Sequence, residues 1–142
     1  MSENRPSSSL VLIVVLAVCA IGLSSCGKDR AATRGAVLYA ENCAVCHGGD
    51  GRGGGGASVP GLSKTPSDLT ILSRENSGNF PTRRIAELID AYAKGEQITR
   101  RMRPFDTLIS GRNRRLRTEE GRVRTPAPTA DLIAYLMSIQ SP

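Results

Sequence analysis

The feature that most constrains this chain is the pentapeptide Cys-Ala-Val-Cys-His at residues 43–47. On a helix, Cys43, Cys46 and His47 stand at positions i, i+3 and i+4, so both thiols and the imidazole project from one face. This spacing is the attachment motif of a c-type haem, in which two thiols form thioether bonds to the porphyrin and the histidine ligates the iron. The motif therefore predicts redox chemistry and one covalently bound haem c, with His47 as an iron ligand.

Two other interpretations of the motif fit the rest of the sequence less well. A zinc site needs four ligands, but His47 is the only histidine, and the other two cysteines, Cys19 and Cys26, belong to an apolar N-terminal stretch or to its end. A thioredoxin-like thiol pair needs a surrounding βαβ pattern, whereas a helix is predicted before the motif and a glycine-rich loop over residues 48–56 follows it. A thiol-redox lipoprotein is the alternative that haem content would exclude.

Residues 1–25 have the pattern of an export signal. Arg5 precedes an apolar stretch over residues 10–23, which is shorter than a comfortable membrane span of about 20 residues and has the length of a signal-peptide core. The domain that follows is therefore expected outside the cytoplasm.

The end of this leader resembles the lipobox of bacterial lipoproteins. In a lipobox a small residue, here Ser25, precedes a cysteine, here Cys26, which is diacylated and becomes the first residue of the mature protein. The resemblance implies a lipoprotein-type signal peptide over residues 1–25, a lipid anchor on Cys26, a tether over residues 26–33 and a place on the periplasmic side of a membrane. An ordinary secreted protein, soluble in the periplasm, and an uncleaved anchor are the alternatives.

The remaining chain is long enough for one domain with one core. Gly35 and Tyr39 continue the stripe of the two motif cysteines at helical spacing, so the first helix is predicted to carry the haem. Three further helices are predicted, with N-caps at Ser67, Thr82 and Thr129. No segment predicts a convincing strand. The apolar residues of these three helices are Leu69, Ile71 and Leu72; Ile85, Leu88, Ile89 and Tyr92, before a stop at Gly95; and Leu132, Tyr135, Leu136 and Ile139.

In order and spacing, three segments resemble a class I cytochrome c. They are the run from glycine through tyrosine to the haem motif at residues 35–47, a Met-x-Pro-Phe segment at residues 102–105, and residues 131–136. The resemblance covers roughly residues 33–140 and implies an all-α class I cytochrome c fold, with residues 34–141 packed around one haem. It also implies that the first and last helices cross at right angles, where Gly35 permits contact with Tyr135.

The resemblance implies a methionine thioether as the second iron ligand. Met102 is the expected ligand because it lies in a loop shortly before a proline, although family members usually have the proline directly after the methionine and Arg103 intervenes here. Met137 is expected to pack in the last helix or to lie at its surface. The remaining protein competitors for the iron are lysines such as Lys64 and Lys94.

The resemblance also implies that a hydrogen bond orients the iron-ligating histidine. A ligating histidine is usually oriented by a hydrogen bond from its second ring nitrogen, and in this family a proline carbonyl after the motif accepts that bond. Residues 59–62, Val-Pro-Gly-Leu, look like that segment. Pro60 is therefore the expected acceptor, and a plain turn proline is the alternative.

An iron with both axial positions filled suits an electron carrier, because an enzyme or a gas sensor keeps one position open. The chain also contains a single Cys-x-x-Cys-His motif, unlike dihaem peroxidases. The expected function is electron transfer by a membrane-tethered monohaem cytochrome c, which carries single electrons between respiratory complexes and converts no substrate. The alternative is a dedicated haem c subunit of one dehydrogenase or terminal oxidase complex.

The chain is basic, with 19 lysines and arginines, 13 acidic residues and a net charge of +6. Arginines gather in residues 112–124, interpreted as a solvated loop, and at Arg100, Arg101 and Arg103 around Met102. Two hypotheses stand equal. In the first, this charge steers the protein onto an acidic surface of a redox partner. In the second, it interacts with anionic lipid headgroups. Nucleic acid is excluded as a partner, because the chain is exported and no aromatic interleaving or reading helix accompanies the arginines.

Overall fold

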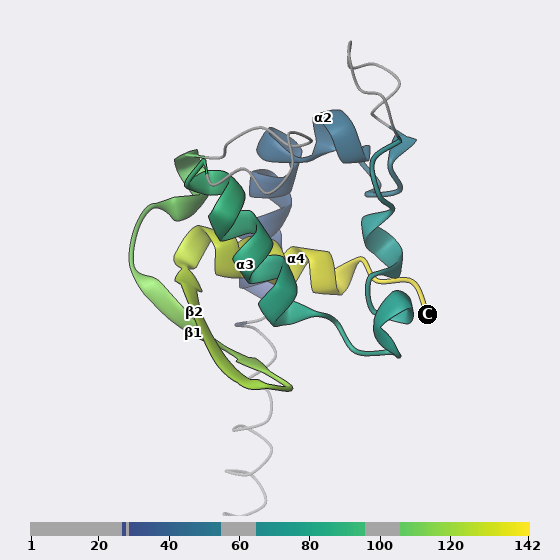
Figure 1. Ribbon diagram of the computed structural model, residues 1–142. Helices are drawn as coiled ribbons and strands as arrows, with labels where there is room; N and C mark the ends of the chain where they lie inside the picture. Colours follow the sequence, from purple (N-terminus) through teal and green to yellow (C-terminus); the bar gives the residue numbers. More distant parts are fainter. Residues whose placement is uncertain (1–26, 28, 55–64, 96–105) are drawn as a thin grey trace, which may run out of the picture. The chain divides into compact units, whose positions relative to one another are not determined.

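The computed structural model describes residue 27 and residues 29–54, 65–95 and 106–142 (Figure 1). The chain divides into two compact units, Met1–Arg30 and Ala31–Pro142. In the first unit the described residues 27, 29 and 30 are helical and exposed. Over the described ranges, no helix combines the length and the apolar character that crossing a membrane requires. The second unit contains the haem motif.

The second unit begins with a helix over residues 31–42, which leads through one turn residue into the short helix α2 (Ala44–His47). Cys43 joins the two helices: its N–H donates to the Tyr39 carbonyl at 2.8 Å, and its carbonyl accepts from the His47 N–H at 2.9 Å. Gly48 ends α2 with a φ of +80°, a conformation that favours glycine. The predicted first helix therefore carries the haem motif at its C-terminal end.

The last helix, α4 (Ala127–Ser138), packs directly on the first helix. A Cβ at Gly35 would overlap the carbonyl oxygen of Asp131 and would lie 2.8 Å from the Cβ of Tyr135. The two backbones can touch only because Gly35 has no side chain. This contact confirms the predicted juxtaposition of Gly35 and Tyr135.

The start of α4 differs from the prediction. Its N-cap is Pro126, and the predicted cap, Thr129, lies inside the helix. Thr129 is fully buried, and its hydroxyl donates to the Leu108 carbonyl at 2.9 Å. A proline in the first turn is well tolerated because the N–H that it lacks has no partner there. Thr129 therefore ties α4 to the neighbouring η4 turn (Asp106–Ile109) instead of starting the helix.

The helix α3 (Thr82–Ala93) is the predicted amphipathic helix, with most of its apolar stripe buried. Its N-cap is Pro81, so the predicted cap, Thr82, is instead the first helical residue. Gly95 follows the helix with a φ of +72° and donates its N–H to the Tyr92 carbonyl at 3.1 Å. It ends the helix as predicted.

Two short 3-10 turns, η2 (Leu69–Ile71) and η3 (Arg74–Asn76), precede α3. The first replaces the short α-helix predicted there, and its N-cap is Asp68 instead of Ser67. The Asp68 carboxylate accepts from the Thr70 N–H at 2.8 Å and from the Thr70 hydroxyl at 2.7 Å. These two hydrogen bonds hold the pKa of Asp68 below its ordinary value.

The arginine-rich segment forms an antiparallel hairpin of β1 (Asn113–Thr118) and β2 (Gly121–Pro126). The interpretation as a solvated loop, and the prediction that the chain has no strand, are therefore wrong. Leu116 and Val123 lie opposite each other and turn away from solvent, with exposed arginines on either side along the strands. So few apolar positions make a weak two-residue period, and the charge conceals it. Gly121, with a φ of +115°, allows the chain to reverse.

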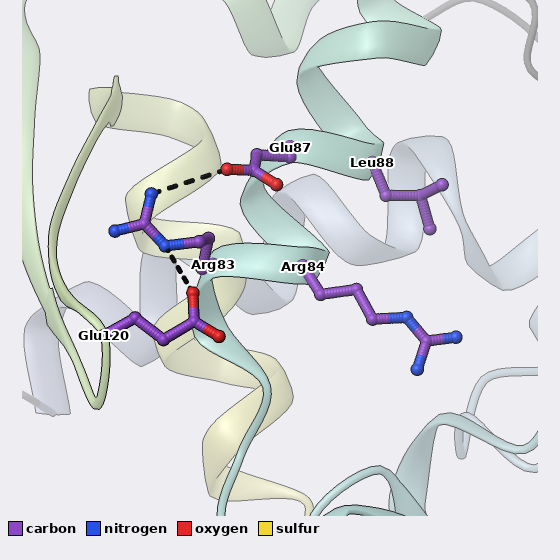
Figure 2. Close-up of a pocket in the computed structure, with 5 residues that line it drawn as sticks. All are labelled: Arg83, Arg84, Glu87, Leu88 and Glu120. Atoms are coloured by element: carbon purple, nitrogen blue, oxygen red, sulfur yellow. Dashed lines mark hydrogen bonds and ion pairs between the residues drawn. The ribbon is translucent and has the colours of Figure 1, made fainter.

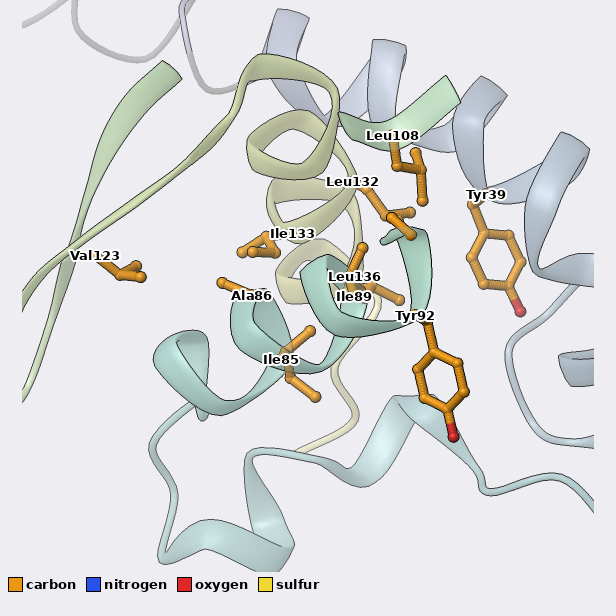
Figure 3. Packing of buried hydrophobic residues seen from close by; sticks show 11 residues of the cluster. Tyr39, Ile85, Ala86, Ile89, Tyr92, Leu108, Val123, Leu132, Ile133 and Leu136 are labelled. Carbon is orange, nitrogen blue, oxygen red and sulfur yellow. The ribbon is translucent and has the colours of Figure 1, made fainter. Parts of the chain in front are cut away.

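The hydrophobic core lies where the first helix, α3 and α4 meet, and residues of η4 and β2 complete it (Figure 3). Tyr39 and Tyr92 lie on one side of a group of aliphatic side chains. The arrangement is predominantly helical, as the class I cytochrome c fold requires. The buried members are Tyr39, Ile85, Ala86, Ile89, Tyr92, Ala93, Leu108, Val123, Leu132, Ile133 and Leu136.

Candidate haem site

The two thiols of the motif lie on one helical turn and form no disulfide. Both Cys43 and Cys46 are half-buried, and the Cys46 N–H donates to the Cys43 carbonyl at 3.1 Å. Burial, and to a smaller extent the neighbouring Cys46 thiol, raise the pKa of Cys43 to about 11. A thiol-redox pair works through a thiolate whose pKa is lowered. The environment of Cys43 therefore argues against that alternative.

The imidazole of His47 is oriented by a backbone carbonyl. Its Nδ1 lies 2.9 Å from the carbonyl oxygen of Ser67. Because a carbonyl can only accept, Nδ1 carries the hydrogen and donates, which leaves the lone pair on Nε2. A histidine held in this way is prepared to ligate a metal through Nε2.

The carbonyl of Ser67 is held in place by the glycine-rich loop. The Gly53 N–H donates to the His47 carbonyl at 2.7 Å, and the Gly51 carbonyl accepts from the Leu69 N–H, also at 2.7 Å. A Cβ at Gly53 would overlap the carbonyl oxygen of Pro66, and Gly53 has a φ of +85°. The loop is thus packed between α2 and residues 66–69, and its glycines permit this close approach.

Tyr39 connects the haem motif to the helix crossing. Its hydroxyl donates to the Gly48 carbonyl at 2.6 Å, at the end of α2, and its ring lies 5.1 Å from the ring of Tyr135 with an interplanar angle of 47°. Burial, together with the nearby Cys43, raises the pKa of Tyr39 well above its ordinary range, so the hydroxyl stays a donor. The position of α2 is therefore coupled to the packing of the first helix on α4.

Several expected site residues lie outside the described residues: Met102, Pro60, Cys26 and Lys64. Among the described residues, the acceptor at Nδ1 of His47 is the carbonyl of Ser67 and not that of Pro60, which the resemblance had implied. The sequence suggested Ser67 only as a helix cap.

Two other side chains that could ligate the iron, Met137 and Lys94, lie within the described residues. Met137 lies on α4 with 49% of its surface exposed, as expected for a residue beside the apolar stripe. The Lys94 ammonium lies 2.6 Å from the Asp90 carboxylate.

Asp131 has a structural role that the sequence only hinted at. Its carboxylate is buried and accepts from Arg34 at 2.6 Å and 2.9 Å and from Arg114 at 2.7 Å. The two arginines come from the first helix and from β1. The signal for this ion-pair cluster was a carboxylate at the start of an otherwise apolar segment. Its two partners could not be chosen from the sequence, because 97 residues separate Arg34 from Asp131.

A surface pocket of about 380 Å³ lies between α3 and the tip of the hairpin (Figure 2). The Arg83 guanidinium lies 2.9 Å from the Glu120 carboxylate and 3.5 Å from the Glu87 carboxylate. Charged side chains dominate this wall, and a porphyrin needs apolar surroundings. The ion pair between Arg83 and Glu120 at this pocket therefore connects the hairpin to α3, and the pocket is not the haem site.

Comparison with known families decides the class of protein. A sequence model described as cytochrome c matches residues 32–140. The chain belongs to the cytochrome c family. Comparison with curated proteins gives no significant match, and comparison with solved structures gives none.

Membership of this family means that the cytochrome carries covalent haem c and transfers electrons, and that it is not an enzyme. The residues present fit that cofactor, because α2 offers two uncommitted thiols and an imidazole whose Nε2 is free for a metal. When bound, the haem supplies an iron that is oxidised and reduced by one electron.

Proposed function

We propose that this cytochrome is a membrane-tethered monohaem electron carrier that passes single electrons between respiratory complexes on the periplasmic side of a bacterial membrane. Cys43 and Cys46 hold the haem, and His47 and Met102 ligate its iron. The observation that supports this assignment most directly is the hydrogen bond from His47 Nδ1 to the Ser67 carbonyl, which directs Nε2 to the metal.

The chain's own groups have separate tasks in this proposal. The two thiols prevent loss of the cofactor, and Ser67 fixes the tautomer and the orientation of His47. The thioether of Met102 would be the second protein ligand of the iron, and such ligation would raise its reduction potential. Pro60 was the expected acceptor for the His47 proton, and in this proposal the Ser67 carbonyl takes that role.

The proposed tether is a lipid on Cys26, with residues 1–25 as a lipoprotein signal peptide and residues 26–33 as the connection to the domain. Arg100, Arg101 and Arg103, which flank Met102, are the proposed contact with an acidic surface of the redox partner. Labelling with a radioactive fatty acid tests the anchor: the label is expected in the parent and absent from Cys26→Ser.

Absorption spectra of the oxidised and reduced protein, made together with a cytochrome c maturation system, test the haem and its ligands. Covalent haem bands are expected, with a sulfur-to-iron band in the oxidised form. Met102→Ala is expected to abolish the sulfur-to-iron band, and the matched variant Met137→Ala to keep it.

Each other result has a definite meaning. Absence of haem would leave a thiol lipoprotein. Haem without the sulfur-to-iron band would mean an open or differently ligated iron. Stable copurification with one dehydrogenase or oxidase would identify a dedicated subunit of that complex and not a free carrier.

A further inference from the structure

The β1–β2 hairpin has two chemically different faces. Leu116 lies opposite Val123 and Arg114 lies opposite Thr125 on the face that turns to the domain. Val123 and Thr125 are buried there, and Arg114 reaches Asp131. On the other face four arginines form two directly opposed pairs, which we call the arginine face: Arg115 with Arg124 and Arg117 with Arg122.

Among the described residues, no ion pair neutralises the charge of the arginine face. All four side chains are exposed, and within the described ranges no carboxylate forms an ion pair with any of them. Like charges directly opposite each other destabilise a hairpin. Four such side chains on one rigid surface therefore indicate an external partner that is strongly anionic.

The hairpin presents this face rigidly. At its base, Arg114 is fixed to the buried Asp131 at 2.7 Å. Near its tip, Arg83 of α3 lies 2.9 Å from the Glu120 carboxylate. Glu119, in the turn between β1 and β2, is the acidic residue closest in sequence to the arginine face that forms no ion pair within the described residues. The four guanidinium groups thus stand on a braced sheet and not on a loop.

The base of the hairpin is linked through Asp131 to the first helix of the second unit. Asp131 binds Arg114 of β1 and also Arg34, three residues after Ala31, where the second unit begins. From there the helix over residues 31–42 rises about 18 Å towards Cys43. The base of the hairpin therefore lies near the start of that helix, and Cys43 follows its other end.

We propose that the arginine face binds the anionic phosphate headgroups of the membrane to which the protein is tethered, so that α2 and its haem face away from the lipid. The tether itself rests on the proposed function. A guanidinium matches a phosphate with two parallel hydrogen bonds, and each arginine near an anionic bilayer strengthens binding. A redox partner needs access to the haem-bearing end, which this orientation leaves free.

The test is arginine-specific modification by phenylglyoxal of the intact lipidated holoprotein, read residue by residue by mass spectrometry. The protein is reconstituted into phosphatidylcholine vesicles with or without phosphatidylglycerol. At low salt, the arginine face is expected to react several-fold more slowly on the anionic vesicles. In 0.5 M salt this protection is expected to disappear, because dissolved ions screen the attraction between exposed arginines and lipid phosphates. Arg74 and Arg84, exposed on η3 and α3, serve as internal controls and are expected to react equally on both vesicles.

A pair of matched variants adds a second readout. Arg115→Gln/Arg124→Gln removes two charges and one like-charge pair, so the hairpin is expected to stay folded while Arg117 and Arg122 lose their protection. Arg74→Gln/Arg84→Gln removes the same charge elsewhere and is expected to leave the protection intact.

Equal reactivity of the arginine face on both kinds of vesicle would overturn the proposal, as would equal protection of Arg74 and Arg84. Protection that appears only when an acidic redox partner is added would assign the face to that protein instead. Flotation with neutral vesicles reports the lipid tether, and the absorption spectrum reports the haem. Failure of the proposed function is therefore distinguishable from failure of this inference.

Discussion

Gly35 lies directly against the carbonyl oxygen of Asp131, at the place where the first helix meets α4. The two nearest atoms that a side chain at residue 35 would meet belong to the backbone of Asp131 and cannot rotate away. Helix packing at this point is therefore fixed by two main chains in contact. Because the rings of Tyr39 and Tyr135 contact each other in a tilted arrangement one turn further on, the same contact sets the position of the haem motif.

Gly35→Ala is accordingly expected to destabilise the holoprotein by about 1–3 kcal/mol or more, the range of overpacked cores. Denaturant unfolding monitored by circular dichroism measures the loss. Gly49→Ala is the control: Gly49 has nothing within 4 Å of the added Cβ, so a change within about 0.5 kcal/mol is expected. Equal stability of the two variants would contradict the tight crossing.

Gly53→Ala is expected to alter the reduction potential without touching an iron ligand. The added Cβ overlaps the Pro66 carbonyl and meets an unfavourable φ of +85°, so the adjacent Ser67 carbonyl shifts from His47. The hydrogen bond that it accepts raises the basicity of the ligand nitrogen and thereby favours oxidised iron. Its loss raises the potential, which a redox titration detects. Gly54→Ala, with open space around its Cβ, should leave the potential unchanged.

Asp131→Asn removes the carboxylate that two arginines share. Breaking a buried ion pair costs about 3–5 kcal/mol, but the side chains of Arg34 and Arg114 are 52% and 45% exposed and stay partly hydrated. We therefore expect a smaller loss of about 1–3 kcal/mol in urea unfolding. The control Asp90→Asn breaks a surface pair with Lys94 and should cost about 0.5 kcal/mol or less. Similar losses in both variants would show that the Asp131 cluster contributes no more than a surface pair.

Acid stability is expected to depend on Asp68. The pKa of this carboxyl is held below its unfolded value by hydrogen bonds from Thr70. The carboxylate therefore adds stability above the ordinary aspartate pKa of about 4, and this stability disappears as the pH falls through the lower, folded-state pKa.

Asp68→Asn is expected to flatten that part of the stability profile, measured by denaturant unfolding at a series of acidic pH values. The exposed Glu75 on η3 provides the control Glu75→Gln. A profile that stays as steep in Asp68→Asn as in the parent would exclude this carboxyl as a source of acid sensitivity.

The sequence predicted the elements whose pattern is local. The amphipathic helices α3 and α4 were predicted from the spacing of their apolar residues. The end of α3 at Gly95 was predicted from the position of this glycine after the last apolar residue of the helix. Their N-caps were predicted wrongly, because Pro81 and Pro126 start these helices without a side-chain hydrogen bond, and the nearby threonines then looked like the stronger signal. Thr129 is instead used in a contact with Leu108 that no local pattern specifies.

Two features depend on contacts that spacing does not encode. The arginine-rich hairpin has Leu116 and Val123 as its only aliphatic pair across the strands, and it becomes a sheet because α3, α4 and Asp131 provide a surface for it. The Ser67 carbonyl reaches His47 because Gly53 packs on Pro66. That approach depends on the three-dimensional path of the glycine-rich loop, so the sequence could indicate only that His47 needs some acceptor.

The ion pair between Arg34 and Asp131 joins positions 97 residues apart, and this has a consequence for how the protein is made. In the proposed export, the N-terminal part of the chain crosses the membrane first, so the haem motif arrives before α4. Until residues 127–138 arrive, Arg34 and Gly35 lack their partners on α4, and these long-range contacts wait for nearly the whole chain. We therefore expect the two thiols to meet the attachment machinery before the fold is complete.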